Sequence, residues 1–205
     1  FKQHWLLVLS LSIFGVTGFN SLVYLGLQTT TAVNAVLMQS VCPILIIVFA
    51  SVVLGERTSR LQWLGVLVSL LGVVVILIRG DMAVLKTLDF KIGDLIVLLA
   101  TLSWAIYTVL LRKLPAKLKG LPILGYTVVI GSMMILPLYL QETLIQNRPM
   151  LFSWGSVGSV IYVAIFASLL AYWFWNHATA KLGASRTGQF AHLLPVFGLT
   201  IATLL

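Results

Sequence analysis

Polar and aromatic side chains recur at helical spacing inside long apolar stretches of this sequence. Side chains three or four residues apart, such as Asn20 and Tyr24, share one face of a helix. Amides and hydroxyls hydrogen-bond polar solutes, and aromatic rings pack against apolar ones. We predict that the side chains of this kind line one central cavity for a small molecule. They are Asn20, Tyr24, Asn34, Gln39, Trp104, Tyr107, Tyr172, Asn176, Gln189 and His192.

The elements that carry these residues are predicted to be membrane-spanning helices. Of 205 residues, 60% are hydrophobic and 9% are charged, whereas a soluble domain carries roughly 25% charged residues. No Asp, Glu, Lys or Arg occurs between Lys2 and Glu56, and a membrane helix needs about 20 mostly apolar residues. We predict an all-α, polytopic membrane helix bundle with antiparallel neighbours. Its seven spans are 5–26, 32–54, 61–79, 94–114, 122–141, 155–178 and 187–205, the last of them barely complete.

The same polar and aromatic residues have a second interpretation once they are placed in a membrane. Trp and Tyr concentrate at membrane–water interfaces, so Tyr24, Trp173 and Trp175 are also candidates for interfacial anchors. Intramembrane Asn and Gln often hydrogen-bond one helix to another. Cavity lining and helix packing both stay open for these side chains.

Lysine and arginine are unequally shared between alternate loops. Nine lie at the N-terminal end and in the loops 55–60, 112–120 and 179–186, against four in the other loops. Cytoplasmic loops carry the excess of Lys and Arg. We therefore place the first set in the cytoplasm of a multi-pass protein in the cell's cytoplasmic (inner) membrane.

A weak internal repeat relates the two ends of the chain. Pro43 and Pro195, equivalent under this repeat, should each kink their helix. By the loop charges these two spans run in opposite directions, which indicates an inverted repeat, typical of secondary transporters. Chance similarity between apolar helices is the alternative. A shift of 152 residues superposes Ile13-Phe14 on Ile165-Phe166, Ala32 on Ala184, Pro43 on Pro195 and Ala50 on Ala202.

His192 is the titratable side chain placed farthest from a span end, because His4 and His177 lie near loops. Histidine takes and gives protons near neutral pH, so proton coupling through His192 is one interpretation. The absence of an expected carboxylate partner argues against it, as does its repeat mate, Ser40, which does not titrate.

The order of short motifs along the chain resembles the EamA-type family of the drug/metabolite transporter superfamily. The resemblance covers the whole chain. It rests on Pro43, the Leu-Gly-Glu-Arg-Thr-Ser run at 54–59, Gly65 and Gly72, the Ser-Trp-Ala-Ile-Tyr run at 103–107, Arg112-Lys113, Gly183-Ala184 and the Leu-Pro-Val run at 194–196.

The resemblance implies a ten-helix fold of two inverted five-helix repeats, of which this chain represents helices three to nine. Residues 1–80 are then the last part of the first repeat, and 94–205 are most of the second. It also implies a secondary transporter, more often an exporter, that moves metabolites such as amino acids or amphipathic drugs by alternating access. A non-transporting membrane scaffold or a lipid-binding membrane protein is the alternative.

The sequence offers little for catalysis. It contains no nucleotide-binding glycine loop, metal-ligand cluster or nucleophile–base set, so we expect no enzyme activity, cofactor or metal. The net charge of +8 is spread between apolar blocks rather than gathered in one patch, so we expect no nucleic-acid partner. The expected partners are a small-molecule solute and the lipid bilayer, and a homodimer is left open.

Overall fold

The computed structural model describes residues 4–78, 90–146, 152–194 and 196–197, and these residues form helices without a strand. Three segments are π-helical (η2, η4, η5) and two are 3₁₀-helical (η3, η6). The elements are α1 (Trp5–Leu11), η2 (Ser12–Gly18), α2 (Phe19–Leu27), α3 (Ala32–Ser40), α4 (Cys42–Leu54), α5 (Arg60–Ile78), α7 (Ile92–Arg112), η3 (Ala116–Leu118), α8 (Leu121–Leu140), η4 (Gln141–Ile145), α9 (Trp154–Tyr162), η5 (Val163–Leu170), α10 (Ala171–Leu182), α11 (Ala184–Gln189) and η6 (Phe190–Leu193).

Adjoining elements combine into helices long and apolar enough to cross a membrane. There are five within the described residues: Trp5–Leu27, Ala32–Leu54, Ile92–Arg112, Leu121–Ile145 and Trp154–Leu182. The 19-residue α5 coincides with one further predicted span. The chain is a multi-pass α-helical membrane protein, as predicted, while most of the predicted span 187–205 lies outside the described residues.

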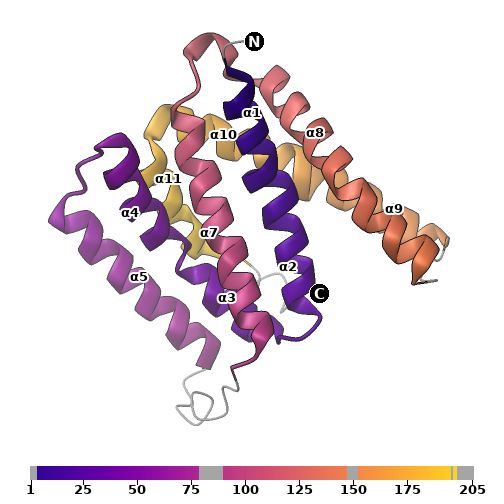
Figure 1. The fold of residues 1–205 in the computed structure, drawn as a ribbon. Coiled ribbons are helices and arrows are strands. Elements are labelled where there is room, and N and C mark those ends of the chain that lie inside the picture. The colour runs from indigo at the N-terminus through magenta and orange to yellow at the C-terminus, as the bar shows by residue number, and fades with distance from the viewer. Residues whose placement is uncertain (1–3, 79–89, 147–151, 195, 198–205) are drawn as a thin grey trace.

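Helix α7 forms the centre of the bundle, with α1–α2, α3–α4 and α10–α11 around it (Figure 1). In its most apolar stretch of 18 residues, 56% of the residues are buried, a larger share than in any other described span. Glycines let the first span approach it closely: a Cβ at Gly15 would lie 2.3 Å from Tyr107 Cδ2, and one at Gly26 would lie 2.6 Å from Val97 Cγ2. In contrast, a Cβ added at Gly65 or Gly72 would meet no described atom within 4 Å.

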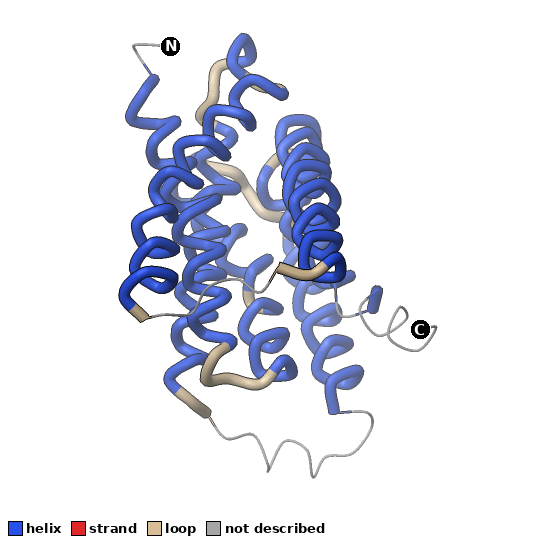
Figure 2. The backbone as a smooth tube through the Cα atoms, turned by 90° about the vertical axis from the view of Figure 1, so that its right-hand side faces the viewer, coloured by secondary structure: helices blue, strands red, loops and turns tan. Residues whose placement is uncertain are grey.

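The helices run side by side, with the connecting loops at their two ends (Figure 2). The first span runs from top to bottom in Figure 1, and α9–α10 runs from bottom to top. The side with the loops 55–59 and 113–120 and the α10–α11 junction is the side that the loop charges place in the cytoplasm, and we call it the cytoplasmic end.

The span Ala32–Leu54 is interrupted between α3 and α4. Helix α3 ends at Ser40, and α4 begins at Cys42 with Pro43 in its first turn. Because proline has no N–H and its ring clashes with the preceding turn, it breaks the helical hydrogen-bond ladder there. The span is therefore interrupted just before Pro43, whereas Pro195 lies outside the described residues.

Candidate substrate cavity

A cavity of about 450 Å³ lies at mid-height of the bundle, beside α7. The first span, the α3–α4 break, α7, the η5–α10 helix and the η6 segment all contribute to its wall. We call it the aromatic cavity. The residues that line it are Phe19, Gln39, Cys42, Thr101, Trp104, Ala167, Ala171, Tyr172, Trp175, Phe190, Ala191, Leu193, Leu194 and Phe197.

Trp104 on α7 is the centre of an aromatic cluster in this wall. Its ring centroid lies 4.7 Å from that of Phe19, 5.1 Å from that of Tyr172 and 5.4 Å from that of Trp175. The Trp104–Tyr172 pair is edge-to-face, an arrangement that aligns a positive ring edge with a negative ring face. Three different spans therefore present aromatic faces and edges to one space.

Hydrogen bonds between helices fix the rings behind this wall. The Tyr172 hydroxyl donates to the carbonyl oxygen of Gly15 at 2.5 Å and accepts from Asn20 Nδ2 at 3.2 Å. The Tyr107 hydroxyl donates to Asn176 Oδ1 at 2.7 Å. The Gly15 carbonyl is in η2, and π-helical segments such as this one occur frequently at functional sites. The tyrosine hydroxyls thus hold helices together instead of facing a solute.

Gln39 is the polar side chain of the wall that makes no hydrogen bond within the described residues. The Thr101 hydroxyl, in comparison, donates to the Val97 carbonyl of its own helix. The wall is therefore mainly aromatic and aliphatic, with one amide available. The sequence predicted amides and hydroxyls beside the aromatic rings of this wall, whereas most of these polar groups hydrogen-bond to other helices.

Of the ten predicted side chains, Gln39, Trp104 and Tyr172 line the aromatic cavity. Asn20 and Tyr107 lie behind its wall: Asn20 hydrogen-bonds Tyr172, and the Tyr107 ring packs against Trp104. Trp175, which the sequence also allowed as an interfacial anchor, lies in the wall and donates from Nε1 to Thr108 Oγ1 at 3.0 Å.

Asn20 and Tyr24 line a different space, an outer groove of about 490 Å³ between α2 and α8–η4. Asn34 lies away from both spaces, where Nδ2 donates to the buried carboxylate of Asp94 at 3.1 Å. Thr30 and the Lys91 backbone N–H also donate to Asp94, so this group joins the α2–α3 loop to the start of α7. The structure therefore gives Asn34 a role between helices and does not bring it to the predicted central cavity.

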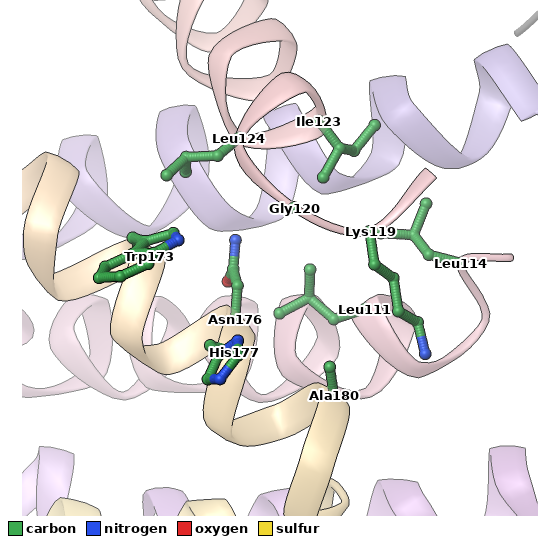
Figure 3. Close-up of a pocket in the computed structure, with 10 residues that line it drawn as sticks. All are labelled: Leu111, Leu114, Lys119, Gly120, Ile123, Leu124, Trp173, Asn176, His177 and Ala180. Carbon is green, nitrogen blue, oxygen red and sulfur yellow. The ribbon is translucent and has the colours of Figure 1, made fainter. Parts of the chain in front are cut away.

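Asn176 lines a smaller cavity of about 150 Å³ between α7, α8 and α10 (Figure 3). Its side chain points from α10 toward Leu124 of α8, with Trp173 and His177 on neighbouring turns. Leu111, Leu114, Ile123 and Leu124 make much of this cavity apolar. Its position near Lys119 and Gly120 places it toward the cytoplasmic end.

Gln189 and His192 line a third cavity, of about 300 Å³, between α5 and the α11–η6 segment. They are three residues apart and face α5 rather than the aromatic cavity. Their neighbours Phe190 and Leu193 line both cavities, so η6 separates the two spaces.

A polar cluster closes the cytoplasmic end of the bundle. Glu56, just after α4, accepts from Ser185 Oγ at 2.7 Å and lies 3.7 Å from Arg112 Nε at the end of α7. Arg112 also donates to the last-turn carbonyls of α10, at Ala180 (3.0 Å) and Thr179 (3.4 Å). Glu56 thus pairs with Arg112, which is far from it in the sequence. The cluster joins α4, α7, α10 and α11.

Sequence reasoning missed most of the apolar part of the cavity wall. Phe19, Phe190 and Leu194 are ordinary apolar residues of a membrane span, and no local pattern separates them from lipid-facing ones. A signal was available for Phe19, the first residue of α2, because it directly precedes the predicted cavity residue Asn20.

Together these features define a class: a polytopic α-helical membrane protein whose spans surround an aromatic cavity beside a central helix. The model of the EamA-like transporter family matches residues 1–78 and 91–205. The chain belongs to this family.

Individual relatives agree with this assignment. The chain is 33% identical over 195 residues to the uncharacterized transporter YyaM of Bacillus subtilis, covering 94% of this chain and 63% of that protein. It is 25% identical over 191 residues to a probable terminal-alkyne amino-acid exporter of Streptantibioticus cattleyicolor, covering 92% of this chain and 61% of that protein. The chain therefore spans about two thirds of the length of these relatives.

A crystal structure of a protein with 19% sequence identity superposes with a TM-score of 0.75, over 100% of this chain and 69% of that one. This similarity supports the fold.

Proposed function

We propose that the chain forms the core of a secondary transporter that exports small amphipathic organic solutes, such as amino acids with apolar side chains or amphipathic drugs. The solute binds in the aromatic cavity and crosses by alternating access between two repeats, residues 1–80 and 94–205. The protein acts in the cytoplasmic membrane and carries no catalytic function.

The observation that supports this proposal most is the wall of the aromatic cavity. Its volume of about 450 Å³ lies in the range of small-molecule sites, which are mostly apolar with few polar groups. Rings from three spans offer an apolar and aromatic surface, and Gln39 offers one amide donor and acceptor. A solute with an apolar body and one polar group fits this chemistry.

The comparisons support both the class of solute and the direction. Matching relatives are named as transporters, and one is named as a probable exporter of a terminal-alkyne amino acid. Such a compound combines a polar amino-acid group with an apolar side chain.

The cytoplasmic cluster supports alternating access. Glu56, Arg112 and Ser185 join the ends of four helices on that side, and we propose that this cluster closes the path from the cavity to the cytoplasm. Opening it requires the Glu56–Arg112 and Glu56–Ser185 contacts to separate. A bundle with two arrangements of this cluster would have two access states.

Solute flux in proteoliposomes tests the proposal. The protein, expressed from its complete reading frame, is reconstituted and supplied with radiolabelled aromatic amino acids, aliphatic amino acids and lipophilic amines. We expect flux of at least one apolar member, and loss of that flux in Trp104→Ala but not in Trp154→Ala, an exposed tryptophan outside the cavity. If no member of the panel moves in either direction, the proposal is wrong, and the scaffold or lipid-binding alternative gains support.

A further inference from the structure

The cavity between α5 and the α11–η6 segment contains two buried polar atoms without partners. His192 is 4% exposed, and its Nδ1 has no hydrogen-bond partner within the described residues. Gln189 Nε2, on the preceding helical turn, is also buried and has no hydrogen-bond partner within the described residues. Both residues line the cavity of about 300 Å³, and Ser69 of α5 lines it as well. Unpaired buried polar groups are costly, so a native one has a partner such as water, an ion or a proton, or a functional role.

The other ring nitrogen fixes the tautomer that a neutral His192 adopts. Nε2 lies 2.8 Å from the carbonyl oxygen of Ser40. A carbonyl only accepts, so Nε2 carries the hydrogen and donates it. In a neutral imidazole Nδ1 is then a lone-pair acceptor. The unpaired atom is therefore a base, buried in the interior of a membrane protein and facing a cavity large enough for water.

The chemistry of the cavity favours a proton over a metal cation as the ligand. A hard cation requires several oxygen ligands, and carboxylates commonly supply them. This lining offers the Ser69 hydroxyl and the Gln189 amide, with no carboxylate among Gly65, Val66, Ser69, Gln189, Phe190, His192 and Leu193. An imidazole nitrogen with a free lone pair is instead a proton acceptor.

We propose that His192 Nδ1 is the proton-binding site that couples solute export to a proton gradient. A proton arriving as hydronium binds Nδ1 and leaves a water molecule, and the Nε2–Ser40 hydrogen bond is kept. This inference rests on the proposed transport function and adds the coupling ion to it.

No described carboxylate on the elements packed against η6 can pair with a proton bound at His192. The elements packed against η6 are α4, α5 and α11, together with α3 at Ser40. Their charged side chains within the described residues are Arg60 of α5 and Arg186 of α11, both cationic, and the other titratable group is Cys42 of α4. An uncompensated charge inside a membrane protein is costly. Protonation therefore shifts the equilibrium toward a conformation in which His192 is better solvated.

The position of His192 connects this shift to the solute. Phe190 and Leu193 of the same segment line the aromatic cavity. Ser40, which accepts the His192 hydrogen bond, is the last residue of α3 before the break at Pro43. A movement of η6 on protonation would therefore change the cavity wall and its contact with the broken span together.

The test separates coupled accumulation from exchange in proteoliposomes supplied with the same solute panel. A gradient of one pH unit can drive up to about tenfold accumulation per proton, since 1.4 kcal/mol corresponds to a factor of ten. We expect this accumulation in the wild type and in His4→Gln, a histidine outside the spans. His192→Gln keeps an amide donor for Ser40 but binds no proton. We expect it to retain exchange at equal pH and to lose the accumulation.

Three outcomes count against the inference in different ways. Accumulation that persists in His192→Gln overturns it. Exchange without any pH-driven accumulation in the wild type also overturns it but leaves the proposed transport intact. A wild type that neither exchanges nor accumulates refutes the proposed function itself.

A spectroscopic measurement tests the site without transport. In protein with ¹⁵N-labelled histidine, the His192 signal is the one missing in His192→Gln. We expect the Nε2–H tautomer at high pH and a second bound proton at Nδ1 on acidification. An Nδ1–H tautomer, or a ring that binds no second proton before the protein unfolds, would contradict the assignment even if the variant transports poorly.

Discussion

At the scale of single residues, Trp104 connects the cavity wall to the centre of the bundle. Its ring contacts Phe19, Tyr172 and Trp175 on the cavity side and lies 5.2 Å from the Tyr107 ring behind it. Aromatic pairs contribute about 0.5–1.5 kcal/mol each beyond the area that they bury. One side chain therefore both shapes the cavity and orients its neighbours.

Replacing Trp104 with alanine should weaken solute binding. Loss of even one or two aromatic contacts to a solute corresponds to roughly a tenfold rise in Kd, because 1.4 kcal/mol is a factor of ten. Equilibrium binding of a transported solute to detergent-purified protein measures this. Trp154→Ala is the matched control, since Trp154 is 93% exposed and should leave Kd unchanged. Equal affinity of both variants would remove Trp104 from the site.

The sequence predicted the candidate site only in part, and the reason lies in what polar groups do inside a membrane. Spacing correctly grouped Asn20 with Tyr24, which line one groove. It could not tell that the Tyr172 and Tyr107 hydroxyls bond Gly15 and Asn176. Which polar groups face a solute depends on the partners that packing brings to them, and those partners lie far away in the sequence.

At the scale of elements, the helices repeat with the same irregularities. The π-helical η5 spans Val163–Leu170, which a shift of 152 residues carries onto 11–18, the position of η2. The cap residues Thr31 of α3 and Gly183 of α11 differ by the same shift. Asn20 and Tyr172 are likewise equivalent and hydrogen-bond each other, as are Ser40 and His192. Equivalent residues contact each other where a two-fold axis passes, which supports the inverted repeat.

The helical spans were well predicted because hydrophobic length alone identifies them. The first six of the seven predicted spans coincide with described helices to within a few residues. The seventh begins at Ala184 and is only partly described. The π-helical segments and the α3–α4 break were harder to place. They depend on hydrogen bonds with other helices, such as that from Ser103 Oγ to the Phe14 carbonyl, and Pro43 alone gave a local signal.

The close contact between the first span and α7 should tolerate no side chain at Gly15. A Cβ there would lie 2.3 Å from the Tyr107 ring, and overpacking of this kind costs about 1–3 kcal/mol. We expect Gly15→Ala to lower the free energy of unfolding by that amount in a denaturant titration in detergent. Gly72→Ala is the control: its Cβ would meet nothing within 4 Å, and alanine favours the helix by up to about 1 kcal/mol.

The Glu56–Arg112–Ser185 cluster should hold the cytoplasmic end closed. Glu56→Gln removes the ion pair with Arg112 and weakens the bond from Ser185. A loss of about 1 kcal/mol shifts a two-state equilibrium about fivefold. We expect a cysteine placed at Ala180 to react that much faster with a membrane-impermeant thiol reagent from the cytoplasmic side. Glu142→Gln, at the opposite end, should not change this rate. An unchanged rate in Glu56→Gln would mean that the cluster does not restrict access.

At the scale of the whole molecule, the account requires that the two repeats face opposite ways across the bilayer. The loop charges predict that the connections at Arg57 and Lys181 lie on the same, cytoplasmic side. Reporter fusions at these two loops, compared with one at Glu142, test this directly. We expect the first two to report the cytoplasm and the third the opposite compartment. Any other distribution removes the inverted topology, and with it the argument for alternating access.

The central claim is that the aromatic cavity is reached by water and occupied by the transported solute. The most direct test is solute protection of Ala171→Cys, a cavity residue, in a background in which Cys42 is replaced by serine. We predict that a small water-soluble thiol reagent labels this cysteine and that saturating solute slows the labelling. Ala116→Cys in the cytoplasmic loop is the control, and its labelling rate should be the same with and without solute. Labelling that solute leaves unchanged, or no labelling from either side of the membrane, would contradict the claim.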